Sequence, residues 1–133
     1  MARMTAPNPG VDAYEFIYDK IDSVPHLEAL VLLWNSRPVG WTLEELASRL
    51  YAPIDKVEEL LRDLVRMQLV AESTTTPAKY SYLPKSEEQN GLLVSLDEAY
   101  RKDLVRISTM IHSKTSSSVR EFARAFRLKQ EKK

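Results

Sequence analysis

Side chains that commonly carry catalysis or bind metals are few and scattered in this chain of 133 residues. Its two histidines, His26 and His112, lie far apart and in no metal-ligand spacing such as H-x-x-x-H. Cysteine is absent, and only three glycines are present, so a glycine-rich phosphate loop is excluded. The carboxylate pairs Glu44-Glu45, Glu58-Glu59 and Glu87-Glu88 are adjacent in sequence, so on a helix their members do not share a face. The sequence therefore predicts a protein that is not an enzyme and that binds no cofactor or metal ion.

The charged residues balance in number, with 19 bases and 19 acids, but they are unevenly distributed. Residues 11–70 carry eleven acids against six bases, a net charge of −5, whereas residues 100–133 carry ten bases against three acids, a net charge of +7. A basic tail of this kind can bind a phosphate backbone or an acidic protein surface. It can equally fold back onto the acidic half of its own chain or of a dimer mate, and both alternatives remain open.

The composition also bears on location. The absence of cysteine fits a reducing compartment. No apolar run approaches the roughly 20 residues that span a bilayer, and residues 1–10 contain no apolar core of signal-peptide length. These features lead us to expect a cytoplasmic protein.

Apolar spacing and capping residues predict helices through the first half of the chain. Residues 1–11 form a flexible lead-in, and a short helix is expected from Asp12. Ser23 is a candidate N-cap for the next helix, and Thr42 with Glu45 forms a capping box for the one that follows. A further helix starts at Pro53, and its apolar stripe is the most regular in the chain: Val57, Leu60, Leu61, Leu64 and Val65.

The second half changes character after this helix. Residues 69–71 and 79–83 are short strand-like segments on either side of the turn-forming stretch 73–77, which predicts a β-hairpin. One long helix is then expected from about Ser86 to Ser113, and a short basic amphipathic helix from about Val119. The predicted fold is mainly α with a small β-hairpin. Its parts are the lead-in (1–11), a first domain (12–84) and a helical extension (85–133).

Residues 24–84 resemble the winged helix-turn-helix domain of MarR-like bacterial transcription regulators. The resemblance rests on residues 41–50 (WTLEELASRL), which correspond to the positioning helix, and on residues 55–70 (DKVEELLRDLVRMQLV), which correspond to the recognition helix and its exit into the wing. The C-terminal segment 122–127 (FARAFR) is similar to a segment that ends small uncharacterised bacterial winged-helix proteins.

The resemblance implies a DNA-binding transcriptional regulator that acts as a homodimer, with double-stranded DNA as its partner. The residues expected to contact nucleic acid are Lys56, Arg62, Arg66, Thr75 and Lys79 in the expected recognition helix and wing, with Arg120, Arg124 and Arg127 of the basic C-terminal helix adding backbone contacts. The apolar stripe of the long helix can pack on the winged helix of its own chain or pair with a dimer mate, and we favour the dimer. The stripe consists of Leu93, Leu96, Tyr100, Leu104, Ile107 and Ile111.

The charges of the expected recognition helix keep a second function open. Its outward positions are Asp55, Lys56, Glu58, Glu59, Arg62, Asp63 and Arg66, of which four are acidic. Carboxylates are repelled by phosphates, and phosphate contacts provide most non-specific affinity for DNA. The alternative is a non-catalytic adaptor that docks another protein through this acidic helix or through the basic C-terminal helix.

Overall fold

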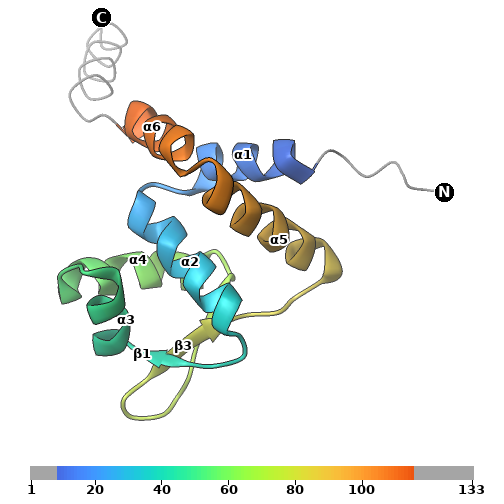
Figure 1. The fold of residues 1–133 in the computed structure, drawn as a ribbon. Coiled ribbons are helices and arrows are strands. Elements are labelled where there is room, and N and C mark those ends of the chain that lie inside the picture. Colours follow the sequence, from blue (N-terminus) through green and yellow to red (C-terminus); the bar gives the residue numbers. More distant parts are fainter. Residues whose placement is uncertain (1–8, 116–133) are drawn as a thin grey trace, which may run out of the picture.

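The computed structural model describes residues 9–115, and it describes side chains from residue 13 to residue 113. Helices make up most of this part of the chain (Figure 1). Within this part the elements follow one another as α1 (Pro9–Lys20), α2 (Val24–Ser36), β1 (Trp41–Thr42), α3 (Leu43–Leu50), α4 (Ile54–Arg66), β2 (Val70–Glu72), β3 (Lys79–Tyr82), α5 (Glu87–Lys102) and α6 (Leu104–Thr115). The mainly helical fold with a small hairpin is confirmed. The first helix begins at Pro9, slightly earlier than expected.

The predicted caps start the helices as expected. The Ser23 hydroxyl accepts a hydrogen bond from the backbone N–H of His26 at 3.3 Å, at the start of α2. At α3, the Glu45 N–H donates to the Thr42 hydroxyl at 3.2 Å, and the Thr42 N–H donates to the Glu45 carboxylate at 2.9 Å. Each pair satisfies backbone donors that the first helical turn leaves without partners.

The core of the helix-turn-helix is the apolar face of α4. Val57, Leu60, Leu61 and Leu64 are buried, while Val65, the fifth residue of the predicted stripe, is only partly buried. This face packs against α2 and α3, and the end of α4 leads directly into β2. The charged positions of α4 other than Asp63 are therefore exposed to solvent.

The hairpin predicted after α4 is confirmed, and a third strand joins it. β2 and β3 pair antiparallel with Ala71 opposite Ser81, and β1 adds to the free side of β3 with Trp41 opposite Tyr80. With only two residues, β1 is too short to show an alternating pattern in sequence. A side chain at Gly40, just before β1, would place its Cβ 3.0 Å from the Lys79 Cβ, so the close approach of the strands favours glycine there.

The helix expected from Ser86 to Ser113 is wrong as a single element, because the chain breaks it into α5 and α6 at Asp103. There the Tyr14 hydroxyl of α1 donates to the Asp103 carboxylate at 2.5 Å, which raises the pKa of Tyr14, as do partial burial and the carboxylate charge. The guanidinium of Arg106 lies 5.0 Å from the centre of the Tyr14 ring.

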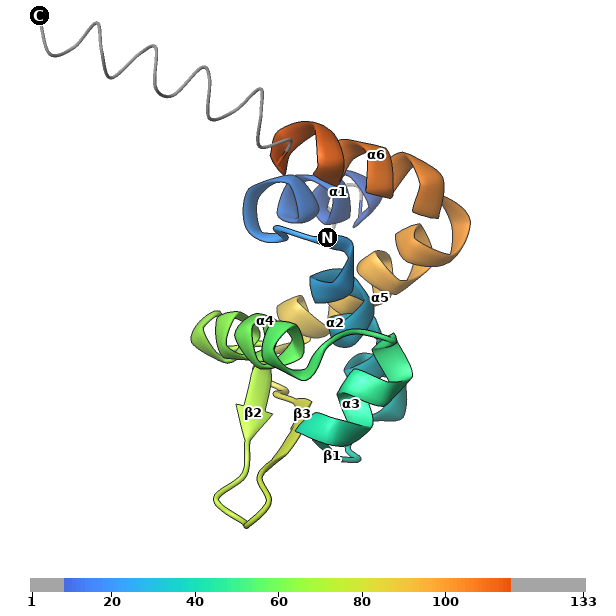
Figure 2. The same ribbon diagram turned by 90° about the vertical axis from the view of Figure 1, so that its left-hand side faces the viewer.

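The physical reason for the break is the length of α1. A straight helix over residues 87–115 would extend about 43 Å at ~1.5 Å per residue, whereas the 12 residues of α1 extend only about 18 Å. By bending at Asp103, the chain brings α5 and α6 onto the same short helix, and Figures 1 and 2 both show α1, α5 and α6 together at one end of the molecule.

The bend changes what the predicted dimerisation stripe contacts. Leu93 and Leu96 of α5, and Ile107 and Ile111 of α6, are fully buried within the chain. Tyr100 is partly buried and Leu104 is exposed. Within one chain, four of the six side chains therefore already have an apolar environment, and their role in a dimer stays a prediction.

Replacing Tyr14 tests the anchor at the α5–α6 bend. We expect Tyr14→Phe to lower the free energy of unfolding by about 1 kcal/mol, because it removes a hydrogen bond to a charged group at a partly exposed site. Urea denaturation followed by circular dichroism measures the change. Tyr51→Phe is the matched control, since the Tyr51 side chain is 94% exposed and should leave the midpoint unchanged. Equal midpoints for both variants would contradict an anchoring role of Tyr14.

Candidate nucleic-acid interface

The outer face of α4 presents six charged side chains to solvent. Exposed there are Asp55, Lys56, Glu58, Glu59, Arg62 and Arg66, whereas Asp63 is partly buried. In Figure 2 α4 lies above the base of the β2–β3 hairpin, which extends beyond the helices as a wing. Arg62 lies on the side of α4 next to the wing, close to Glu72 and Tyr80, whereas Lys56 lies on the side next to the start of α2.

Both arginines of this face pair with acids of the same helix. Arg62 lies 3.3 Å from the Glu58 carboxylate, and Arg66 lies 3.0 Å from that of Asp63. Exposed pairs of this spacing stabilise a helix by only about 0.3–0.5 kcal/mol. A charge-assisted hydrogen bond to a phosphate contributes more than this, so the pairs orient the arginines without preventing them from reaching a ligand.

Asp63 also connects α4 to the start of α2. Its carboxylate accepts a hydrogen bond from Nε2 of His26 at 2.9 Å, and Nδ1 of His26 lies 2.6 Å from the Ser23 hydroxyl. Partial burial opposes the negative charge of Asp63, but the hydrogen bonds and positive charges of His26 and Arg66 outweigh it and lower the pKa of the carboxyl group. The role of His26 is therefore to hold α4 against α2, and sequence spacing could not show a pairing across 37 positions.

The wing is organised by its own hydroxyl groups. The Ser73 hydroxyl lies 2.6 Å from that of Thr75 and accepts a hydrogen bond from the Lys79 N–H at 2.9 Å, while the Thr75 hydroxyl donates to the Pro77 carbonyl at 2.9 Å. Thr75 therefore shapes the loop in addition to being exposed on it. The Lys79 side chain is exposed at the first residue of β3, where the loop of the wing closes.

Two apolar side chains at the turn into α4 were missed by reasoning from the sequence. Tyr51 is 94% exposed and Ile54 is 48% exposed, although both are large and hydrophobic. Sequence patterns identified this turn only as a break between helices, because exposure depends on how α3 and α4 are arranged. An aromatic residue two positions before Pro53, the N-cap of α4, was the one signal available.

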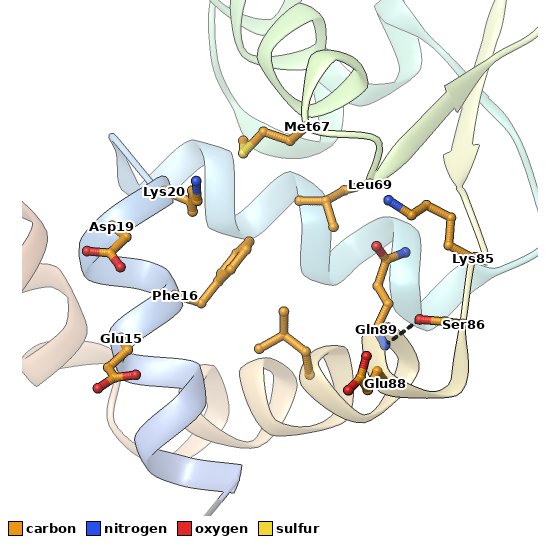
Figure 3. Close-up of a pocket in the computed structure, with 11 residues that line it drawn as sticks. Glu15, Phe16, Asp19, Lys20, Met67, Leu69, Lys85, Ser86, Glu88 and Gln89 are labelled. Atoms are coloured by element: carbon orange, nitrogen blue, oxygen red, sulfur yellow. Dashed lines mark hydrogen bonds between the residues drawn. The ribbon is translucent and has the colours of Figure 1, made fainter. Parts of the chain in front are cut away.

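A separate pocket lies where the layer formed by α1, α5 and α6 meets the winged helix. It is lined by α1, the start of α5 and the α4–β2 connection, and its volume is about 760 Å³. In Figure 3 Phe16 and Leu69 point into the space, while Glu15 and Asp19 lie on the outer side of α1. Its apolar floor and charged rim have the chemistry to accept a small amphipathic molecule.

Three of the predicted contact residues lie outside the described part of the chain. Arg120, Arg124 and Arg127 belong to the segment after residue 115, so their positions are not described. Among residues 9–115, no three His, Asp or Glu side chains come together as a metal site would require. In the same part of the chain, no helix combines the length and apolar character needed to cross a membrane.

Comparison with known proteins identifies the fold. No protein-family model and no curated protein matches the sequence. Among solved structures, a MarR family protein from Bacillus stearothermophilus is 22% identical, with 97% of this chain and 88% of that chain covered and a TM-score of 0.52. RV1404 from Mycobacterium tuberculosis is 16% identical, with 91% and 83% covered and a TM-score of 0.51. S. aureus MepR bound to ethidium bromide is 17% identical, with 92% and 86% covered and a TM-score of 0.50. The chain has a MarR-like winged-helix fold.

Acid titration tests the contact between α2 and α4. Because the pKa of Asp63 is lowered in the folded chain, its carboxylate stabilises the fold above about pH 3.8, the usual value, and this contribution is lost as pH falls through the lower folded pKa. We expect Asp63→Asn to reduce stability at pH 7 and to show a shallower loss of stability between pH 5 and pH 3, as measured by urea denaturation at each pH.

Glu98→Gln removes an exposed carboxylate from α5 and serves as the control for this titration. Its stability should follow that of the unmodified chain at every pH. A parallel shift of the Asp63→Asn curve, with its acid slope unchanged, would exclude the proposed contribution of Asp63.

Proposed function

We propose that the protein is a non-catalytic, DNA-binding transcriptional regulator of the winged-helix type, acting as a homodimer. The observation that carries the proposal is the free outer face of α4 beside the wing. The 13 residues of α4 form a helix about 20 Å long, and the major groove of B-DNA, about 12 Å wide, admits one α-helix. The fold supports this use because MepR, one of the structural neighbours, is a transcription regulator.

The contacts follow from the exposed cations and the wing. Lys56, Arg62 and Arg66 would meet the duplex from α4, and Lys79 with Thr75 from the wing. Arg120, Arg124 and Arg127 would add backbone contacts from the C-terminal segment. Lys and Arg release counterions when they neutralise phosphates, so this binding weakens steeply as salt concentration rises.

The homodimer would form through the end of the molecule that α1, α5 and α6 build. Since Leu93, Leu96, Ile107 and Ile111 are buried in their own chain, the exposed side chains near the α5–α6 bend are the ones open to a partner. These are Leu104 and Val105, the second of which is 81% exposed. A two-fold axis at this end would direct both copies of α4 toward successive turns of one duplex.

A second candidate function is supported by the acids of α4. Four of its seven outward positions are carboxylates, and two of its three cations are paired with them. Such a face also suits a basic protein partner. The alternative is therefore an adaptor that docks through α4 or through the basic C-terminal segment.

One substitution separates the two functions. Glu58→Gln removes a negative charge and releases Arg62 from its ion pair. If α4 faces a duplex, we expect affinity for bulk double-stranded DNA to rise roughly 2- to 5-fold at low salt, because a repulsive charge near the phosphates is lost. Fluorescence anisotropy of a labelled duplex, titrated at several salt concentrations, measures both the affinity and its log-linear salt dependence.

Glu98→Gln, on the exposed side of α5, is the matched control and should leave affinity unchanged. No detectable binding to duplex DNA at low salt would end the regulator hypothesis and favour the adaptor. Affinity that is unchanged in Glu58→Gln would place the duplex on a surface other than α4.

A further inference from the structure

Tyr51 and Ile54 form an apolar pair whose exposure the core does not explain. Large hydrophobic side chains are exposed at only seven of the positions that the structure describes, and Tyr51 is the most exposed of them. A single exposed apolar residue is ordinary on a protein surface. Here two of the seven lie three positions apart, one at the C-cap of α3 and the other at the first residue of α4.

The turn holds Tyr51 firmly in an unfavourable backbone conformation. Tyr51 has φ = 54° and ψ = 45°, in the left-handed region, where a residue with a side chain costs roughly 1–2 kcal/mol. Its N–H bonds the carbonyls of Ala47 and Ser48, and the N–H of Ala52 bonds that of Ala47 at 3.1 Å. Glycine would occupy this position without strain. The strained tyrosine gains nothing from burial, which points to a contact with another molecule.

The location of the pair indicates the kind of contact, on the basis of the proposed function. In helix-turn-helix proteins the N-terminal residues of the recognition helix contact base edges in the major groove. The apolar group that bases present there is the 5-methyl group of thymine. We propose that Tyr51 and Ile54 contact thymine methyl groups and thereby give the protein a preference for A·T base pairs.

The charged neighbours of the pair do not oppose this preference. Asp55 and Glu58 follow within the first two turns of α4, are exposed, and can only accept hydrogen bonds when ionised. In the major groove adenine offers its N6 amino group as a donor and cytosine offers its N4 amino group, so a carboxylate can accept a hydrogen bond from either base pair. The preference for A·T therefore rests on the apolar side chains, because only thymine presents a methyl group.

The experiment compares a duplex of alternating adenine and thymine with the same duplex in which uracil replaces thymine. Uracil lacks only the 5-methyl group, so the backbone charge and the pairing are retained. We expect the unmodified protein to bind the thymine duplex roughly five-fold or more tightly than the uracil duplex. A five-fold difference is the lower end of the discrimination that one good base contact provides. Competition at one fixed low salt concentration, read by fluorescence anisotropy, measures the ratio.

Two pairs of variants test whether Tyr51 and Ile54 cause the difference in affinity between the thymine and uracil duplexes. Tyr51→Gly removes the ring and the strain together, and Gln68→Gly is its control, because Gln68 also has a left-handed conformation (φ = 63°) at the end of α4. Both should fold at least as stably as the unmodified chain, yet only Tyr51→Gly should bring the ratio toward one. Ile54→Ala should also lower the ratio, and Val94→Ala, which truncates a similarly exposed residue on α5, should not.

Each outcome is decisive. A ratio near one for the unmodified protein, with clear binding to both duplexes, overturns the methyl contact and leaves the proposed regulator intact. A ratio that persists in both Tyr51→Gly and Ile54→Ala overturns the assignment to this pair. No binding to either duplex at low salt overturns the regulator itself, and the inference with it.

Discussion

The burial of one face of α4 determines most of the remaining structure. Val57, Leu60, Leu61 and Leu64 lose their contact with water against α2 and α3, and burying four such side chains contributes several kcal/mol, about 1.5–3 each. This packing orients the helix about its own axis. The charged residues must then face outward, and the chain leaving α4 must enter β2 at the edge of the sheet. The outer face, the wing and the turn carrying Tyr51 all follow from that single orientation.

The outer face combines exposure with an unusual balance of charge. Its arginines are held by weak, solvent-exposed pairs, whereas Asp63 is held more firmly by His26 from α2. Charge alone therefore gives this helix little attraction for a phosphate backbone. Under the regulator hypothesis, affinity would depend on the wing, the C-terminal cations and contacts with base edges. The same balance of charge is what keeps an adaptor function open, because a basic protein surface would meet few repulsive groups there.

The layer formed by α1, α5 and α6 depends on the short length of α1. α1 is short, and the bend lets both α5 and α6 pack against it. The hydrogen bond from Tyr14 to Asp103 lies at the bend and is supported by Arg106. Because α1 precedes α2 in the chain but packs with α5 and α6, this layer joins the two ends of the described residues and leaves an amphipathic pocket where it meets the winged helix.

Local interactions determined what could be predicted from the sequence. The caps at Ser23 and Thr42, the stripe of α4 and the turn-rich wing depend on residues a few positions apart, and all were confirmed. The bend at Asp103 depends on a partner 89 positions away, and the strand β1 depends on β3, so neither had a local pattern. Tertiary structure likewise decided which apolar residues are buried: it covered Leu93 and Ile107 and left Tyr51 and Ile54 in water. Periodicity shows that a helix has an apolar face, but only the packing of distant elements determines whether that face is covered.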